Sequence, residues 1–296
     1  MSSISWPANS TTTSGSDAAH ERPDPAMDVR LMLEFAFMQR ALAAALAIGV
    51  VCGALGFFVV LRRLAFIGVG ISHSAIGGIA LAVVLGWNPL VTAAVFSVAV
   101  ALVIARLSRG GRLSEDTLIG VLFSGSMALG VVLFSLQRGY QQDLFGYLFG
   151  NVLAVTPAEL LVLGGAGLLV LGVLALLFRP LLLVAFDEEV ARAYGHPVGL
   201  LDAALLVLLA VTVVIGVRLV GIILVEALLV IPAATATLWA PHYRMQLLLS
   251  MSLGATSGVA GLAAAYALDL AAGGTIVLVS VAVFLVSLAL RPARAA

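Results

Sequence analysis

The sequence predicts an all-α fold, a polytopic bundle of eight or nine transmembrane helices. Hydrophobic residues make up 62% of its 296 residues and charged residues only 10%, whereas a soluble domain carries about 25% charged residues. The apolar residues also come in long blocks, and Ala41–Leu61 contains no charged side chain. About 20 such residues carry a helix across the hydrocarbon core. Transmembrane β-strands would instead give short alternating segments, which this sequence lacks.

The apolar blocks give the order of the predicted spans. They cover residues 41–61, 64–86, 89–107, 117–136, 158–178, 200–217, 219–240, 245–268 and 274–290. The interruptions are too short for a soluble domain, and no GxxxxGK[ST] phosphate-binding loop occurs. Any energy source is therefore expected on another chain, and we expect no permanently bound cofactor. Residues 1–30 are polar, and we interpret them as a disordered tail before a transmembrane domain over 31–296.

Arginine placement predicts how the chain is oriented in the membrane. Arginines cluster after the first, third, fifth, seventh and ninth blocks, as Arg62 and Arg63 do after the first. Loops rich in basic residues stay in the cytoplasm, so these ends are predicted to be cytoplasmic and the N-terminus external. Arg138 and Arg218 fall on the opposite side, which makes the assignment a majority one. The formal net charge is zero, so nothing suggests a nucleic-acid partner.

His73 is the first candidate for chemistry, because it lies within an otherwise apolar span. Ionisable groups inside a membrane are costly, and they commonly mark a substrate or proton pathway. A neutral imidazole is also a common ligand for transition metals. A buried histidine that only bonds to a neighbouring helix is the alternative.

Glu226 is the second candidate, as the only acidic residue deep within a span. An ionised carboxylate there needs a partner, a proton or a metal ion. Pro232 follows in the same block and is predicted to kink the helix, as in many transporters with a polar site. We predict that Glu226 and His73 face one cavity and share a metal ion. A protonated glutamate bonded within the bundle is the alternative.

A charged stretch after the fifth block predicts a short amphipathic helix near 187–195 on the cytoplasmic face. Acidic residues at its start suit the helix dipole, and a glycine followed by Pro197 suits its end. It is either an ordinary surface helix or a docking element for a soluble partner. The candidate docking residues are Asp187, Glu188, Glu189, Ala191, Arg192 and Gly195.

Small residues repeat along one face of two of the predicted spans. Gly70, Ser74 and Gly78 are four residues apart, and so are Gly254 and Gly258. Such faces let helix backbones approach closely in lipid, where packing drives association. We interpret them as packing faces.

Several motifs, in order, resemble those of the permeases of manganese and zinc ABC importers, the ABC-3 family. The matching segments are Val59–Arg63, Gly70–His73, Glu115–Gly120, Tyr147–Asn151, Leu153–Pro157 and Ile231–Ala236. The resemblance covers about residues 33–291. It implies a multi-pass inner or plasma membrane permease surrounded by lipid, importing zinc, manganese or iron.

The resemblance also implies partners and roles. The permease would form a homodimer with the metal path at its centre, lined by His73. The predicted helix near 187–195 would be the coupling helix, at which two cytoplasmic ABC ATPase subunits dock. An extracytoplasmic metal-binding protein would deliver the ion. One departure is Val69, where many members carry an aspartate on the same helix face as the histidine. We expect Glu226 to supply the charge absent there.

Two other functions stay open at this point. One is an ABC permease for a chelated metal or cobalamin, which predicts a wide cavity without inward-facing ligands. The other is a stand-alone secondary transporter or channel, in which the helix near 187–195 would have no partner. His73 and Glu226 favour the metal-ion permease, while their ligand types do not distinguish zinc, manganese and iron.

Overall fold

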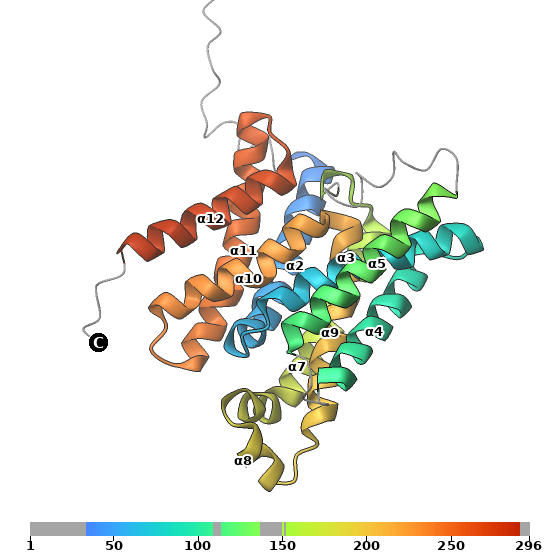
Figure 1. Cartoon of the computed structure of the whole chain (residues 1–296). Coiled ribbons are helices and arrows are strands. Elements are labelled where there is room, and N and C mark those ends of the chain that lie inside the picture. Colours follow the sequence, from blue (N-terminus) through green and yellow to red (C-terminus); the bar gives the residue numbers. More distant parts are fainter. Residues whose placement is uncertain (1–33, 109–113, 137–149, 151, 291–296) are drawn as a thin grey trace, which may run out of the picture.

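The computed structural model describes residues 34–108, 114–136, 150 and 152–290, and these residues form a helical bundle (Figure 1). Their helices are α2 (Ala36–Leu61), α3 (Ala65–Leu85), α4 (Pro89–Ser108), α5 (Glu115–Ser135), η1 (Val152–Ala154), α7 (Pro157–Phe186), α8 (Glu188–Ala193), α9 (Val198–Val220), α10 (Ile222–Trp239), α11 (Tyr243–Leu268) and α12 (Ala272–Leu290). Within the described part, nine helices are long and apolar enough to cross a membrane. This confirms the predicted all-α class, and each predicted block corresponds to one of these helices. The predicted tail and most of the Tyr147–Asn151 motif lie outside the described residues.

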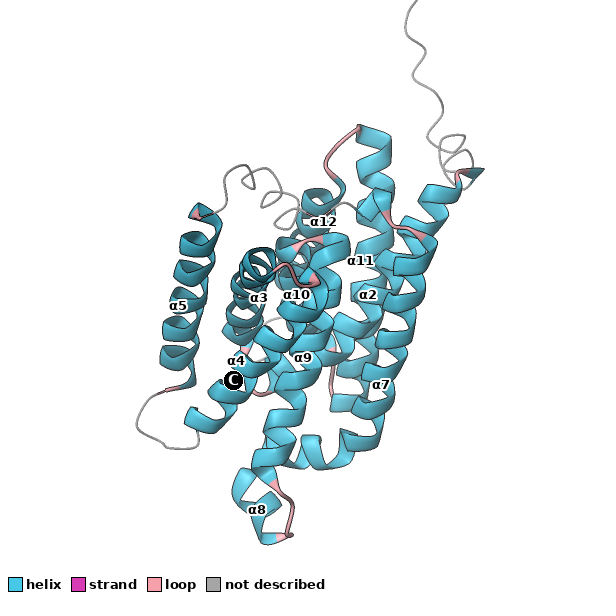
Figure 2. Ribbon diagram, turned by 90° about the vertical axis from the view of Figure 1, so that its right-hand side faces the viewer, coloured by secondary structure: helices cyan, strands magenta, loops and turns pink. Residues whose placement is uncertain are grey.

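Helix α2 forms the centre of the bundle. It packs against α7, α9, α10 and α11, and its side chains Phe57 and Phe58 are fully buried. Because lipid is as apolar as a leucine side chain, burial of these rings does not by itself drive assembly. Close packing does, and α2 supplies it with glycines that face other helices. Helix α5 lies instead at one edge of the bundle (Figure 2).

The predicted small-residue faces are close helix contacts. A Cβ atom added to Gly49 of α2 would lie 2.5 Å from the carbonyl oxygen of Gly254 in α11. Nearby, the Ser250 hydroxyl donates a 2.6 Å hydrogen bond to the carbonyl of Gly53. On α3, a Cβ atom at Gly78 would lie 2.7 Å from the Ala93 backbone in α4. The packing interpretation of these faces is therefore confirmed.

The Gly49–Gly254 crossing predicts a stability effect. Gly49→Ala should destabilise the protein by about 1–3 kcal/mol, because the new methyl group overpacks against backbone that cannot move aside cheaply. Gly164→Ala on α7 is the matched control, since nothing lies within 4 Å of a Cβ atom there. Thermal unfolding in detergent should show a lower melting temperature for the first variant only. Equal melting temperatures would show that the crossing tolerates extra volume.

The two ends of the bundle follow the predicted alternation of spans. Arg62 after α2 pairs with Asp202 near the start of α9, whereas Glu159 at the start of α7 pairs with Arg218 near the end of α9. Helix α7 has 30 residues, roughly 45 Å at 1.5 Å per residue, which exceeds a hydrocarbon core of about 30 Å. Its final turns therefore leave the hydrocarbon region, and α8 projects beyond the bundle at that end (Figure 1).

Candidate metal pathway and coupling helix

The structure brings His73 of α3 and Glu226 of α10 together. The His73 Nδ1 atom lies 3.2 Å from Glu226 Oε1, and both side chains retain about a fifth of their exposure. The Phe123 ring of α5 lies edge-on to the imidazole, with ring centroids 5.0 Å apart. Three helices thus contribute to one small polar site inside the bundle.

The hydrogen bonding of His73 leaves one ring nitrogen open. Nδ1 lies 2.9 Å from the carbonyl oxygen of Val69, so the tautomer with a proton on Nδ1 donates to that carbonyl and leaves a lone pair on Nε2. A bond of this kind from the second nitrogen is the usual way to orient a metal-binding histidine. Glu226 Oε1 is buried and accepts no hydrogen bond from the described residues. The Nε2 lone pair and the Glu226 carboxylate are therefore both open to a cation, but on different sides of the ring, because Oε1 contacts Nδ1 and not Nε2. One ion can bind both only after the imidazole or the carboxylate turns.

This pair is a sparse ligand set. Among the residues that the structure describes, no group of three or more His, Cys, Asp or Glu side chains could hold a metal ion. A resident structural or catalytic metal has three or four protein ligands. Two ligands suit a transient ion, because conduction requires binding weak enough for release.

Pro232 lies inside α10 and is buried. Proline has no backbone N–H, so the carbonyl one turn earlier, at Leu228, lacks its usual helical donor. The helix nevertheless runs from Ile222 to Trp239 without a break. Pro232 thus removes one backbone hydrogen bond from α10, after Glu226, and does not end the helix.

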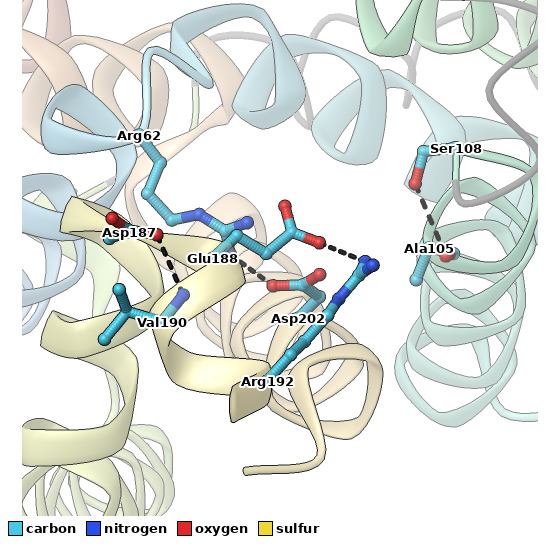
Figure 3. Close-up of polar contacts among 8 residues, drawn as sticks. All are labelled: Arg62, Ala105, Ser108, Asp187, Glu188, Val190, Arg192 and Asp202. Atoms are coloured by element: carbon cyan, nitrogen blue, oxygen red, sulfur yellow. Dashed lines mark hydrogen bonds and ion pairs between the residues drawn. The ribbon is translucent and has the colours of Figure 1, made fainter. Parts of the chain in front are cut away.

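The predicted helix near 187–195 is α8. The Asp187 carboxylate caps its start by accepting a 2.9 Å hydrogen bond from the Val190 amide. Gly195 ends it with a φ of +77°, a left-handed conformation that glycine adopts at low cost. Glu188 and Arg192, one turn apart, form an exposed ion pair (Figure 3).

One predicted docking residue lies on the wrong side of α8. Ala191 is fully buried, within the main hydrophobic cluster, so its side chain cannot contact a soluble partner. It holds α8 against the bundle. The exposed side chains of this segment include Glu189, Arg192, Val190 at 37% and Tyr194 at 78%. A helix of 6 residues gives too little periodicity to show which of its faces is buried.

The Arg62–Asp202 ion pair joins the ends of α2 and α9 beside α8 (Figure 3). Its atoms Nη1 and Oδ1 are 2.5 Å apart, with side-chain exposures of 14% and 21%. Because α8 leads directly into α9, this pair ties the segment bearing α8 to the turn between α2 and α3. His73 lies on α3, the helix that follows this turn.

Sequence reasoning did not anticipate the ion pair between Arg218 and Glu159. The Arg218 Nε and Glu159 Oε1 atoms are 3.3 Å apart, and this contact neutralises an arginine that departs from the predicted charge bias. Glu159 also takes part in a capping box with Thr156 at the start of α7. The spacing Thr156-Pro157-Ala158-Glu159 is a recognisable signal for such a box.

Comparison with known proteins identifies the family. The model of the ABC 3 transport family matches residues 34–291. The chain belongs to this family. It is thus a multi-pass membrane permease of the ABC type, as the motifs predicted.

Relatives of this ABC-3 permease include metal transport proteins. The manganese import system permease ScaB of Streptococcus parasanguinis is 42% identical over 259 residues, which cover 88% of this chain and 92% of ScaB. The manganese transport system membrane protein MntC of Halalkalibacterium halodurans is 39% identical over 261 residues, covering 88% and 89% of the two chains. A Haemophilus influenzae membrane protein named for iron transport is 34% identical over 263 residues, covering 88% and 96%.

Solved structures share the fold of this ABC-3 permease. A chain of PsaBC from Streptococcus pneumoniae, solved with a Fab, superposes with a TM-score of 0.80 at 37% identity, covering 90% of this chain and 96% of that one. An inward-facing ABC transporter of the metal-chelate type gives 0.72 at 20% identity, covering 92% and 91%. The second likeness concerns the fold alone, so it does not favour a chelated substrate.

Proposed function

We propose that this chain is the membrane-spanning permease subunit of an ATP-driven importer, and that its cargo is a divalent transition metal ion, manganese first. The contact between His73 and Glu226 carries the proposal. It offers a nitrogen and an oxygen ligand inside a bundle that is otherwise apolar. Ionisable groups at membrane depth commonly mark a substrate or ion pathway, because placing them there costs free energy.

The relatives favour manganese among the possible cargoes. ScaB and MntC are named for manganese, and one more distant relative is named for iron. One carboxylate and one imidazole suit either manganese or iron. This pair includes no thiolate, the soft ligand that favours zinc over manganese. Cys52, the only cysteine, is buried in α2. Iron is therefore the second candidate and zinc the third.

The expected partners follow from the architecture of an importer. Cytoplasmic ABC ATPase subunits would bind at α8, where Val190 and Tyr194 expose apolar surface next to charged side chains. An extracytoplasmic metal-binding protein would load the opposite end, and two copies of the permease would surround the ion path. We assign no ATP hydrolysis to this chain.

Metal uptake in cells lacking their own importers tests the proposal. The permease is expressed with its ATPase and binding protein, and the cells are supplied with equal concentrations of manganese, iron and zinc. We expect ATP-dependent accumulation of manganese above the other two. Accumulation that persists without the ATPase would support a stand-alone transporter, and uptake of a chelate in place of free ions would support the chelate permease. Either result would refute the proposal.

A further inference from the structure

A groove on the outer surface of the bundle lies between α7 and α11, and neither the ion path nor α8 uses it. Its free volume is about 440 Å³, within the range of about 300–1,000 Å³ typical of small-molecule sites. Both helices pack on α2, whose buried Ala54 lines the groove between them. The apolar walls are formed by Leu171, Leu174, Phe178, Leu247 and Met251.

One end of the groove is basic. Arg179 of α7 lines it and is exposed. Arg244, in the first turn of α11, lies beyond the residues that line the groove. Its Nε atom donates a 3.2 Å hydrogen bond to the Tyr243 hydroxyl, and the Tyr243 ring is 6.3 Å from the ring of Phe178, which does line the groove. No carboxylate in the described part of the chain forms an ion pair with either arginine.

The start of α11 strengthens this positive end. Its N-cap residue, His242, makes no side-chain capping hydrogen bond, so the first amide groups of α11 have no side-chain acceptor there. Arg244 adds a positive charge to a helix terminus that is already positive. Such a helix terminus favours a bound anion.

The depth of Arg179 suits a lipid phosphate. Arg179 is about two turns before the end of α7 and roughly 33 Å along the helix from Pro157. The hydrocarbon core is about 30 Å thick, so the guanidinium lies at the level of the headgroups. It lies at the α8 end of the bundle, which the arginine distribution assigns to the cytoplasm, where anionic lipids are concentrated.

The groove suits a thin occupant. A helix about 10 Å across fills roughly 420 Å³ in each 5.4 Å turn, so a spanning helix of more than five turns would project well beyond a groove of about 440 Å³. An extended acyl chain is thinner and matches the apolar walls.

We propose that this groove is a binding site for one anionic phospholipid. An acyl chain lies over Ala54 between α7 and α11, and the phosphate accepts charge-assisted hydrogen bonds from Arg179 and Arg244. The lipid would brace α7, the helix that leads into α8. The site is independent of the cargo, so it stands whichever metal the permease carries.

Native mass spectrometry of the full-length permease, with its ATPase where the complex is stable, tests the headgroup. The protein is exchanged into detergent with equal amounts of phosphatidylglycerol and phosphatidylcholine vesicle lipid of identical chains. We expect at least about tenfold preference for the anionic lipid, and about tenfold loss of its binding in Arg179→Gln, as for one charge-assisted phosphate contact. Arg106→Gln, at the same end of α4, is the matched control. Equal retention of both lipids, or equal effects of the two variants, would overturn the proposal.

A second pair of variants tests the acyl chain. Ala175 lines the groove, whereas its neighbour Leu176 is 82% exposed and does not. Ala175→Trp should fill the groove and reduce retained phosphatidylglycerol about tenfold, with no loss of melting temperature, while Leu176→Trp should retain it. Unchanged lipid binding in Ala175→Trp would place the lipid elsewhere. A change of oligomeric state in either groove variant would make the face a protein interface and refute the site.

Discussion

Glu226→Gln should reduce metal uptake by about ten- to hundredfold while the protein still assembles with its partners. Glutamine keeps the shape and volume of the side chain, and it removes the negative charge beside His73. An interaction with a charged group contributes about 1.5–3 kcal/mol, and each 1.4 kcal/mol changes an equilibrium tenfold. Initial rates of manganese uptake, at matched expression, measure the effect. Uptake at the wild-type rate would leave Glu226 with a packing role only.

His73→Ala should abolish uptake as well, but a proton relay through this histidine would give the same result. Manganese binding to the purified permease, followed by electron paramagnetic resonance, separates the two roles. Direct ligation predicts that the signal of bound manganese changes in His73→Ala. An unchanged signal together with lost uptake would support a proton relay instead.

The geometry also suggests a rescue experiment. Val69 lies one turn before His73 on α3, so an aspartate there shares the same helix face. If Glu226 supplies the charge that Val69 lacks, Val69→Asp should partly restore uptake to Glu226→Ala. Val69→Asn is the matched control, because it has nearly the same shape without the charge. Rescue by both variants, or by neither, would count against compensation by charge.

Loss of the exposed apolar side chains of the α8 segment should detach the ATPase. Val190→Ser with Tyr194→Ser removes two side chains that are 37% and 78% exposed. Burying one such side chain contributes about 1.5–3 kcal/mol, so the double variant should bind the ATPase at least tenfold less tightly. Co-purification and ATPase activity stimulated by the permease measure the loss. The matched control is Tyr266→Ser on α11, which is 37% exposed at the opposite end of the bundle.

Ala191→Arg should behave differently from the surface variant. A guanidinium cannot enter the fully buried position of Ala191 without lifting α8 off the bundle. We therefore expect both a lower melting temperature and uncoupled ATP hydrolysis. If this variant is stable and the Val190/Tyr194 variant binds the ATPase normally, α8 is not the docking element.

The fold could be predicted because its signals are local. Hydropathy blocks predicted eight or nine spans, since a bilayer of given thickness sets the length of a helix. Most predicted bounds lie within a few residues of the helix ends, but the block over 158–178 falls short of α7, which runs from Pro157 to Phe186. The ends of α8 were equally readable, because the Asp187 cap and the Gly195 stop act within one turn. The helix faces that pack closely, such as the face of α11 that carries Gly254, were also predicted, because small residues recur there every four positions.

The partners of those faces could not be predicted in this way. A helix that is apolar on every side gives no sign of which face turns inward, and its rotation depends on the packing of its neighbours. For this reason the sequence left Arg218 of α9 as an exception to the charge bias, although Glu159 pairs with it. The buried position of Ala191 was missed for another reason, because α8 is too short for periodicity to show its buried face.

The sequence by itself determined that this protein is a helical membrane permease, that His73 and Glu226 are its ionisable groups within the membrane, and that a capped helix lies near residue 190. Only the tertiary structure decided that these two side chains meet, that Glu159 pairs with Arg218, and that Arg179 lines an apolar groove between α7 and α11. The physical reason is the same for each. The length of a membrane-spanning helix, and the free-energy cost of placing an ionisable group inside it, depend on that segment and on the bilayer. Which side chains touch depends on how two helices pack, and in lipid that packing depends on shape rather than on hydrophobicity.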